Sequence, residues 1–246
     1  MSVRKLLGFL FLVGMLVSCG VLPQKNTYHA TSKSVELGVV GNRKISVYKT
    51  DFDVTSIPVY KNLIKVTTVE KSFTKGIYKN YLEATKEKKG IHKVNYIDSL
   101  EVKPTYIDLI LEDKVAVIKA LNQEENESVF KYVKNIPEAK LVSALRMVST
   151  PEVKKQLQQA DAIYVKTNNQ KNQKVYLFNK EKQIGVLDVS KTTIFGYQVS
   201  SFCWEITERE KIKLATLLNE GENCTSNTKR NPKKLEKELI DRRLKF

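Results

Sequence analysis

Four strand-like segments follow one another between residues 161 and 206, and they constrain the fold more than any other feature. Each alternates apolar and polar side chains: "DAIYVKT", "KVYLFNK", "QIGVLDV" and "TIFGYQVSSFCWEI". The links between them are short and polar. "NKEKQ" predicts a hairpin turn and "TNNQKNQ" predicts a loop. Strands joined by short links pair in antiparallel fashion, so this stretch predicts an antiparallel sheet.

The first half of the chain mixes strand and helix patterns. Alternation predicts strands at residues 43–49, 62–70 and 92–102, and a hairpin of two strands within residues 105–122, with its turn at residues 112–114. Residues 75–90 predict a helix that ends at Gly90, a plausible C-cap. Residues 122–139 predict a second helix, because acidic residues lie at its start and Lys at its end.

Helices are also predicted between and after the later strands. Residues 150–160 begin with Thr150 and Pro151, which suit the N-cap and the first helical position. Residues 207–221 give the clearest helix, with Thr207 as N-cap and Gly221 at the end. Residues 140–148 are ambiguous. Because helices fall between groups of hairpin-linked strands, the sequence predicts an α+β fold with a mainly antiparallel sheet, as one domain over residues 35–224.

The amino terminus carries an apolar run that ends at a cysteine. Arg4 and Lys5 precede it, and residues 6–17 contain no charged side chain. Twelve helical residues cover roughly 18 Å, which is too short to span a bilayer core of about 30 Å. The pattern is typical of a secretory signal peptide. Its end, Leu16-Val17-Ser18-Cys19, resembles the lipobox of bacterial lipoproteins; an ordinary signal peptide and a buried helix are the alternatives.

The lipoprotein resemblance implies where the chain is held. Cleavage before Cys19 would remove residues 1–18, and acyl chains such as palmitate would anchor Cys19 in a membrane. Residues 19–34, small and polar, would then be a tether. Gly20 follows the cysteine, which in this family favours the outer membrane over the inner one, and no acidic run directs the chain to the cell surface. We therefore expect a lipid-anchored protein that faces the periplasm.

The charge of the chain limits its partners. The formal net charge is +15, and removal of residues 1–18 leaves +13. The basic residues are mostly Lys, and Arg is the residue suited to bidentate recognition of bases and phosphates. Export also separates the chain from most nucleic acid. We therefore expect no nucleic-acid partner, but an anionic lipid, an anionic envelope polymer or another envelope protein.

Two cysteines remain after Cys19. In an oxidising compartment the pair Cys203 and Cys224 predicts a disulfide bond, worth roughly 3 kcal/mol for a loop of this length. Two reduced thiols are the alternative.

The carboxyl-terminal segment, residues 225–246, is polar and then strongly basic. Leu235, Leu239, Ile240 and Leu244 have the spacing of a weak amphipathic helix. The two interpretations are a solvated helix and a helix that docks on a membrane surface. For docking, the candidate contacts are the following basic residues: Lys233, Lys234, Lys237, Arg242 and Arg243. The fold itself is not expected to depend on this segment.

The sequence offers no catalytic or metal-binding motif. Both histidines are unpromising, since His29 lies in the expected tether and His92 in a lysine-rich turn. Two acidic clusters, at residues 51–53 and 108–113, are explained by turn chemistry. "SFCWEI" predicts core packing around Trp204.

The leading hypothesis is therefore a non-enzymatic binding or accessory lipoprotein without a cofactor. The alternatives are a periplasmic inhibitor or immunity protein and an envelope hydrolase.

Overall fold

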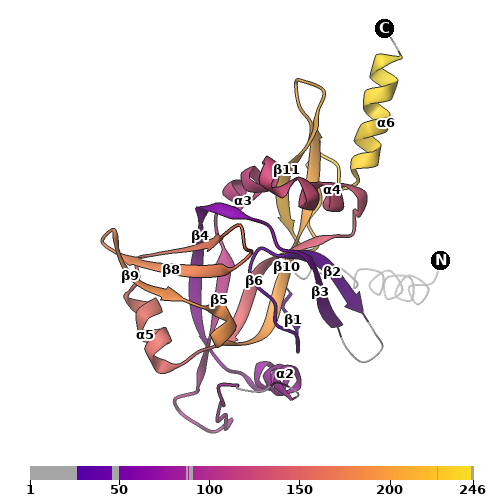
Figure 1. Cartoon of the computed structure of the whole chain (residues 1–246). Coiled ribbons are helices and arrows are strands. Elements are labelled where there is room, and N and C mark those ends of the chain that lie inside the picture. Colours follow the sequence, from indigo (N-terminus) through magenta and orange to yellow (C-terminus); the bar gives the residue numbers. More distant parts are fainter. Residues whose placement is uncertain (1–26, 46–49, 87, 89–90, 226, 245–246) are drawn as a thin grey trace, which may run out of the picture.

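An eleven-stranded antiparallel sheet forms the centre of the protein (Figure 1). The computed structural model describes residues 27–45, 50–86, 88, 91–225 and 227–244. The main strand order is β1-β10-β6-β5-β4-β7-β8-β9; β11 pairs with β10, and β2 pairs with β3 and β6. The strands are β1 (His29–Ala30), β2 (Val40–Ile45), β3 (Thr50–Ser56), β4 (Tyr60–Ser72), β5 (Thr105–Leu111), β6 (Lys140–Val148), β7 (Ala162–Thr167), β8 (Gln173–Asn179), β9 (Lys182–Leu187), β10 (Thr193–Ile206) and β11 (Ile212–Asn219).

Five α-helices accompany the sheet in the described part of the chain. They are α2 (Lys75–Thr85), α3 (Lys114–Leu121), α4 (Glu127–Asn135), α5 (Pro151–Gln159) and α6 (Pro232–Arg243). The main core joins α3, α4 and α5 to the sheet. A smaller aromatic core joins α2 to β5 and β10 through Phe73, Tyr81, Tyr106 and Phe195. Two short 3-10 turns lie at Glu124–Asn126 and Val189–Lys191.

The predicted strands of the second half are confirmed. β7, β8, β9 and β10 occupy the four alternating segments, and the expected turn joins β8 to β9. The helices predicted at residues 122–139 and 150–160 are α4 and α5, and the Thr150 side chain accepts a hydrogen bond from the backbone N–H of Val153. Residues 140–148 form β6. The result is a mainly antiparallel sheet with helices, consistent with the predicted α+β class.

The helix predicted at residues 207–221 is wrong, because β11 occupies most of this stretch. The Thr207 hydroxyl accepts from the backbone N–H of Lys211, so Thr207 closes a hairpin turn instead of capping a helix. β11 pairs with β10 from Ser200 to Ile206, with an irregularity between Cys203 and Trp204. This irregularity lets side chains at helical spacing face the core, which explains why the apolar pattern was misleading.

The hairpin predicted within residues 105–122 is wrong in its second half. β5 is a strand, but residues 114–121 form α3. The Asp113 side chain accepts from the backbone N–H of Ala116 and caps the helix. Val117 and Leu121 then lie one turn apart, both fully buried in the main core.

Residues 92–102 alternate in sequence but form no strand in the described structure. Tyr78 and Tyr81 of α2 donate hydrogen bonds to the carbonyls of Val94 and His92, at 3.2 and 2.7 Å. These carbonyls are therefore satisfied without a neighbouring strand. Earlier in the chain, residues 46–49 of the strand predicted at 43–49 and Gly90, the predicted C-cap, lie outside the described residues.

Both ends of the described chain are more firmly packed than the sequence predicts. β1, in the expected tether, pairs with β10 at Tyr197 and Gly196. At the other end, Lys229 forms a backbone bridge with Trp204, and Leu235 of α6 is 2% exposed. Residues 229 and 235 of the carboxyl-terminal segment thus contact the body of the domain, which argues against the expectation that the fold is independent of residues 225–246. No helix among the described residues combines the length and the apolar character needed to cross a membrane.

Candidate functional site: a basic pocket beside a disulfide

The site lies at the point along β10 where its pairing with β6 ends and its pairing with residue 229 begins. β6 pairs with β10 as far as Lys140, which is opposite Ser201. Three residues further along β10, Lys229 takes the place of β6 and pairs with Trp204 through hydrogen bonds of 2.8 and 2.9 Å. The end of β6 and the segment at residues 229–230 therefore flank the same part of β10. Their side chains converge there.

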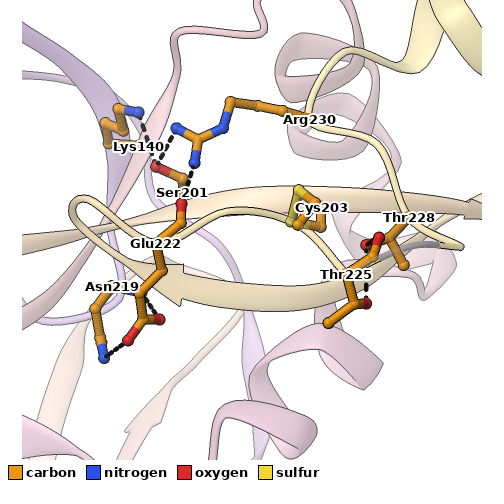
Figure 2. The surroundings of a disulfide bond; sticks show 9 residues. Lys140, Ser201, Cys203, Asn219, Glu222, Thr225, Thr228 and Arg230 are labelled. Atoms are coloured by element: carbon orange, nitrogen blue, oxygen red, sulfur yellow. Dashed lines mark hydrogen bonds between the residues drawn. A yellow bond between two sulfur atoms is a disulfide. The ribbon is translucent and has the colours of Figure 1, made fainter.

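Two cations converge on one neutral hydroxyl at this point (Figure 2). Lys140 Nζ donates to Ser201 Oγ at 2.8 Å, and Arg230 Nη1 donates to the same oxygen at 3.3 Å. Among the described residues, neither cation forms a salt bridge with a carboxylate. Burial lowers the pKa of Lys140, and the positive charge of Arg230 lowers it further. The pair is thus partly desolvated; the charges of Glu220 and Glu138 act on Lys140 in the opposite direction but do not cancel the lowering of its pKa.

A pocket of about 870 Å³ opens beside these cations. Five of its lining side chains are basic and one, Glu138, is acidic. The lining residues are Asn42, Arg43, Pro137, Glu138, Lys140, Asn223, Cys224, Thr225, Thr228, Lys229, Arg230, Asn231 and Lys234. A concave site with this charge balance attracts anions.

One basic residue of the lining already has a partner. Arg43 Nη1 donates to Glu220 Oε1 at 2.6 Å, and the other carboxylate oxygen lies 2.8 Å from His29 Nε2. Burial would raise the pKa of Glu220, but the hydrogen bond with His29 and the charge of Arg43 outweigh it and lower that pKa. His29, which the sequence places in a tether, is therefore held beside the pocket.

The disulfide holds the segment that supplies Arg230. Cys203 and Cys224 are joined in the structure, and Cys224 lines the pocket. Arg230 Nη2 also donates to the backbone carbonyl of Glu222 at 2.7 Å, while the Glu222 side chain accepts from Asn219 (Figure 2). Covalent and polar contacts together fix the guanidinium next to Ser201.

A second charged cluster lies elsewhere in the sheet. Asp108 on β5 is fully buried and accepts from Arg146 of β6, at 2.9 and 3.3 Å, and from Lys71 of β4 at 3.0 Å. The Tyr28 ring lies against the Arg146 guanidinium, 3.7 Å from its carbon to the ring centroid. Here the carboxylate is satisfied by protein groups, so this cluster acts as a structural link between strands.

The two acidic clusters, at residues 51–53 and 108–113, are predicted from the sequence to belong to turns. Turn chemistry is wrong for Asp51 and Asp53, since both lie in β3; Asp53 forms ion pairs with Lys33 and Lys44. It is also wrong for Asp108, whereas Asp113 does cap a helix. Within the described ranges, no group of His, Cys, Asp and Glu side chains is placed to hold a metal ion. Trp204 is 1% exposed and packs edge-on against Phe130, as predicted.

The residues predicted to contact a membrane divide into two groups on α6. Arg242 and Arg243 are paired with Glu238 and Glu210. The remaining three are exposed and form no salt bridge with a described residue: Lys233, Lys234 and Lys237. Lys234 also lines the pocket. Cys19 and the rest of the lipobox lie outside the described residues.

Sequence reasoning found Cys203, Cys224 and Lys234 but missed the pair at the centre. Lys140 and Arg230 are 90 positions apart, and no local pattern connects them. The one available signal was the expected disulfide, which brings Cys224 and the basic residues after it close to "SSFCW".

Comparison of the chain with protein-family models, with curated proteins and with solved structures found no match.

Proposed function

We propose that this chain is a lipid-anchored, non-enzymatic binding protein of the cell envelope, and that its basic pocket binds an anionic group. The lipobox-like sequence at Leu16–Cys19 supports the anchor. The observation that carries the binding role is the convergence of Lys140 and Arg230 on the Ser201 hydroxyl, with no salt bridge from either cation to a described carboxylate. Partly buried cations are normally paired, so an external anion would complete the site.

Anion binding predicts a specific response of Lys140. A bound anion restores a counter-charge and raises the lowered pKa of the ammonium, so binding should be accompanied by proton uptake at alkaline pH. The hydroxyl of Ser201 keeps both cations oriented when the pocket is empty. The site is therefore preorganised for an oxyanion with several acceptor atoms.

The test uses inorganic phosphate with the mature chain carrying Cys19→Ala, which removes the lipid. Isothermal titration at low ionic strength should detect binding that falls about tenfold or more in Lys140→Met and in Arg230→Met. Lys166→Met, at an exposed position of β7, removes the same charge three strands away from β6 in the sheet order and serves as the control. Equal loss in all three variants would show diffuse attraction and contradict the proposal.

The anchor has its own test. Cys19→Ala in the full chain should abolish acyl labelling and move the protein from the detergent phase to the aqueous phase. Labelling that survives this substitution would exclude the lipoprotein assignment, whatever the result with phosphate.

One observation favours an envelope hydrolase as a second candidate. Ser201 and Lys140 are 2.8 Å apart, and a lysine with a lowered pKa can act as the base of a Ser–Lys pair. Against this, Ser201 is 4% exposed within β10, between β6 and β11, and it is absent from the pocket lining. A fluorophosphonate probe should therefore fail to label the wild-type chain. Labelling that disappears in Ser201→Ala would favour the hydrolase.

A further inference from the structure

We infer that the basic pocket binds the phosphate group of an anionic phospholipid in the membrane that holds the anchor. This inference rests on the proposed function and names its ligand. The argument combines the donors in the pocket, the short reach from the anchor to the pocket, and the exposed surface that continues from the pocket along α6.

The donors suit a phosphodiester. Lys140 presents an ammonium and Arg230 a planar guanidinium, and together they can bind two oxygens of one phosphate. The pocket volume of about 870 Å³ also admits a small polar headgroup beside the phosphate. Asn223, Thr225 and Asn231 in the lining carry the polar side chains that a hydroxyl-rich headgroup requires.

Chain length places the pocket near the bilayer. His29 contacts Glu220, whose other carboxylate oxygen binds the pocket residue Arg43. His29 lies ten positions after Cys19, and a fully extended chain covers at most about 35 Å over ten positions. A lipid on Cys19 therefore keeps this side of the domain within that distance of the headgroups. Tethering of this kind gives an effective concentration in the millimolar range, so weak intrinsic affinity is sufficient.

The surface beside the pocket has the composition of a membrane contact. α6 starts at the pocket and projects from the body of the protein (Figure 1). Lys233, Lys234 and Lys237 are exposed on it, and further along Ile240 is 57% exposed and Leu244 is 80% exposed. Basic side chains beside exposed apolar ones suit the interface between headgroups and acyl chains. α6 adjoins the pocket, because Lys234 belongs to both.

The experiment measures sedimentation of the mature Cys19→Ala chain with vesicles. One set contains phosphatidylcholine alone and the other contains phosphatidylcholine with phosphatidylglycerol. We expect binding to the second set only, weakened about tenfold by Lys140→Met and by Arg230→Met but not by Lys166→Met. Soluble glycerophosphate should compete with the vesicles. Circular dichroism melting of each variant verifies that it is folded, and Arg230→Met serves if Lys140→Met is not.

The outcomes separate this inference from the proposed function. Phosphate binding in the pocket without vesicle binding would overturn the lipid assignment and leave a soluble or polymer-borne phosphate as the ligand. Vesicle binding that is equally strong in Lys140→Met and Lys166→Met would also overturn it, because the attraction would then be diffuse. Absence of binding to both phosphate and vesicles would overturn the inference together with the proposed function.

Discussion

Two basic residues of β6, Arg146 and Lys140, illustrate two ways in which this sheet accommodates a charge. Arg146 is 11% exposed in its side chain and faces the fully buried Asp108, which also binds Lys71. Lys140, six residues earlier on the same strand, shares the hydroxyl of Ser201 with a second cation. In the first arrangement both cations have a carboxylate partner, so we expect the cluster to contribute to stability. In the second, neither cation forms a salt bridge with a described carboxylate, and an anion from outside the chain can supply that partner.

The largest loss of stability is expected at the cluster of Asp108, Arg146 and Lys71. Asp108→Ala leaves Arg146 buried without its carboxylate, and breaking such a pair costs about 3–5 kcal/mol of unfolding free energy. Urea unfolding followed by tryptophan fluorescence measures this loss, since the only tryptophan, Trp204, is buried. The double variant Asp108→Leu/Arg146→Met removes both charges and should recover most of the stability. If Asp108→Ala lost less than about 1 kcal/mol, the cluster would not be structural.

The disulfide should affect the pair Lys140 and Arg230 more than the cluster around Asp108. Cys203 and Cys224 are separated by 21 residues, and loss of the bond costs roughly 3 kcal/mol in the chain-entropy model. Cys203→Ser/Cys224→Ser should therefore lower the urea midpoint and also weaken phosphate binding, because the segment carrying Arg230 is released. Arg230→Met, with the bond intact, should weaken phosphate binding with little loss of stability and so separates the two effects.

Mass spectrometry of protein taken from its own compartment checks the disulfide prediction directly. The peptides of Cys203 and Cys224 should be linked before reduction. Two free thiols would contradict the predicted bond. The double serine variant should then have nearly the same stability and phosphate affinity as the wild type.

Loss of a hydrogen bond usually lowers stability, but replacement of Lys140 should leave the stability unchanged or raise it. Because the pKa of Lys140 is lowered in the folded protein, the unfolded chain binds its proton more tightly, and the cationic form destabilises the fold at neutral pH. This cost is relieved as pH rises through the lowered pKa toward the ordinary value of 10.5. Lys140→Met should therefore match or exceed the wild type in melting temperature at neutral pH while losing phosphate binding.

The same sign gives a sharper test in the pH profile. The unfolding free energy of the wild type should rise relative to that of Lys140→Met as pH increases from the lowered pKa toward 10.5. Only the wild type has an ammonium at position 140 that loses its proton in this range. Lys166→Met again controls for the loss of one surface charge. A Lys140→Met variant that is clearly less stable at neutral pH would mean that the hydrogen bond to Ser201 outweighs the desolvation of the ammonium.

The sequence predicts the regular strands of this fold better than it predicts the site. β7 to β10 are joined by short polar links, so local alternation is enough to define them. β11 has an equally apolar pattern. It is a strand and not a helix because it pairs with one edge of β10, and that edge exists only in the folded chain. α3 was missed because Asp113 suits a turn as well as a cap.

The site depends on contacts of still longer range. Cys203 and Cys224 could be paired from their number and the expected compartment alone. Lys140 and Arg230 meet only because residue 229 takes over from β6 beside β10, and neither residue has a neighbour in sequence that signals this. A count of basic residues indicates an anionic partner but cannot locate where it binds.

The smallest expected effect concerns Glu220, the carboxylate that already binds one pocket residue, Arg43. Its pKa is lowered in the folded state, because His29 and Arg43 outweigh burial. Its contribution to stability is therefore present above the ordinary value of 4.5 and is lost as pH falls through the lowered pKa. Since the side chain is 29% exposed, solvent screening limits this contribution to about 1 kcal/mol or less.

Glu220→Gln tests both sides of the comparison. Unfolding free energies should differ from the wild type near neutral pH and converge in acid, whereas Glu208→Gln, at an exposed position, should show no difference at either pH. The substitution also frees Arg43 and removes a negative charge that favours the protonated form of Lys140. Phosphate affinity should rise because Arg43 becomes a further donor for the bound anion. A fall in affinity would mean that the ion pair of Glu220 and Arg43 holds the pocket residues in place, and that phosphate binding by Lys140 and Arg230 depends on it.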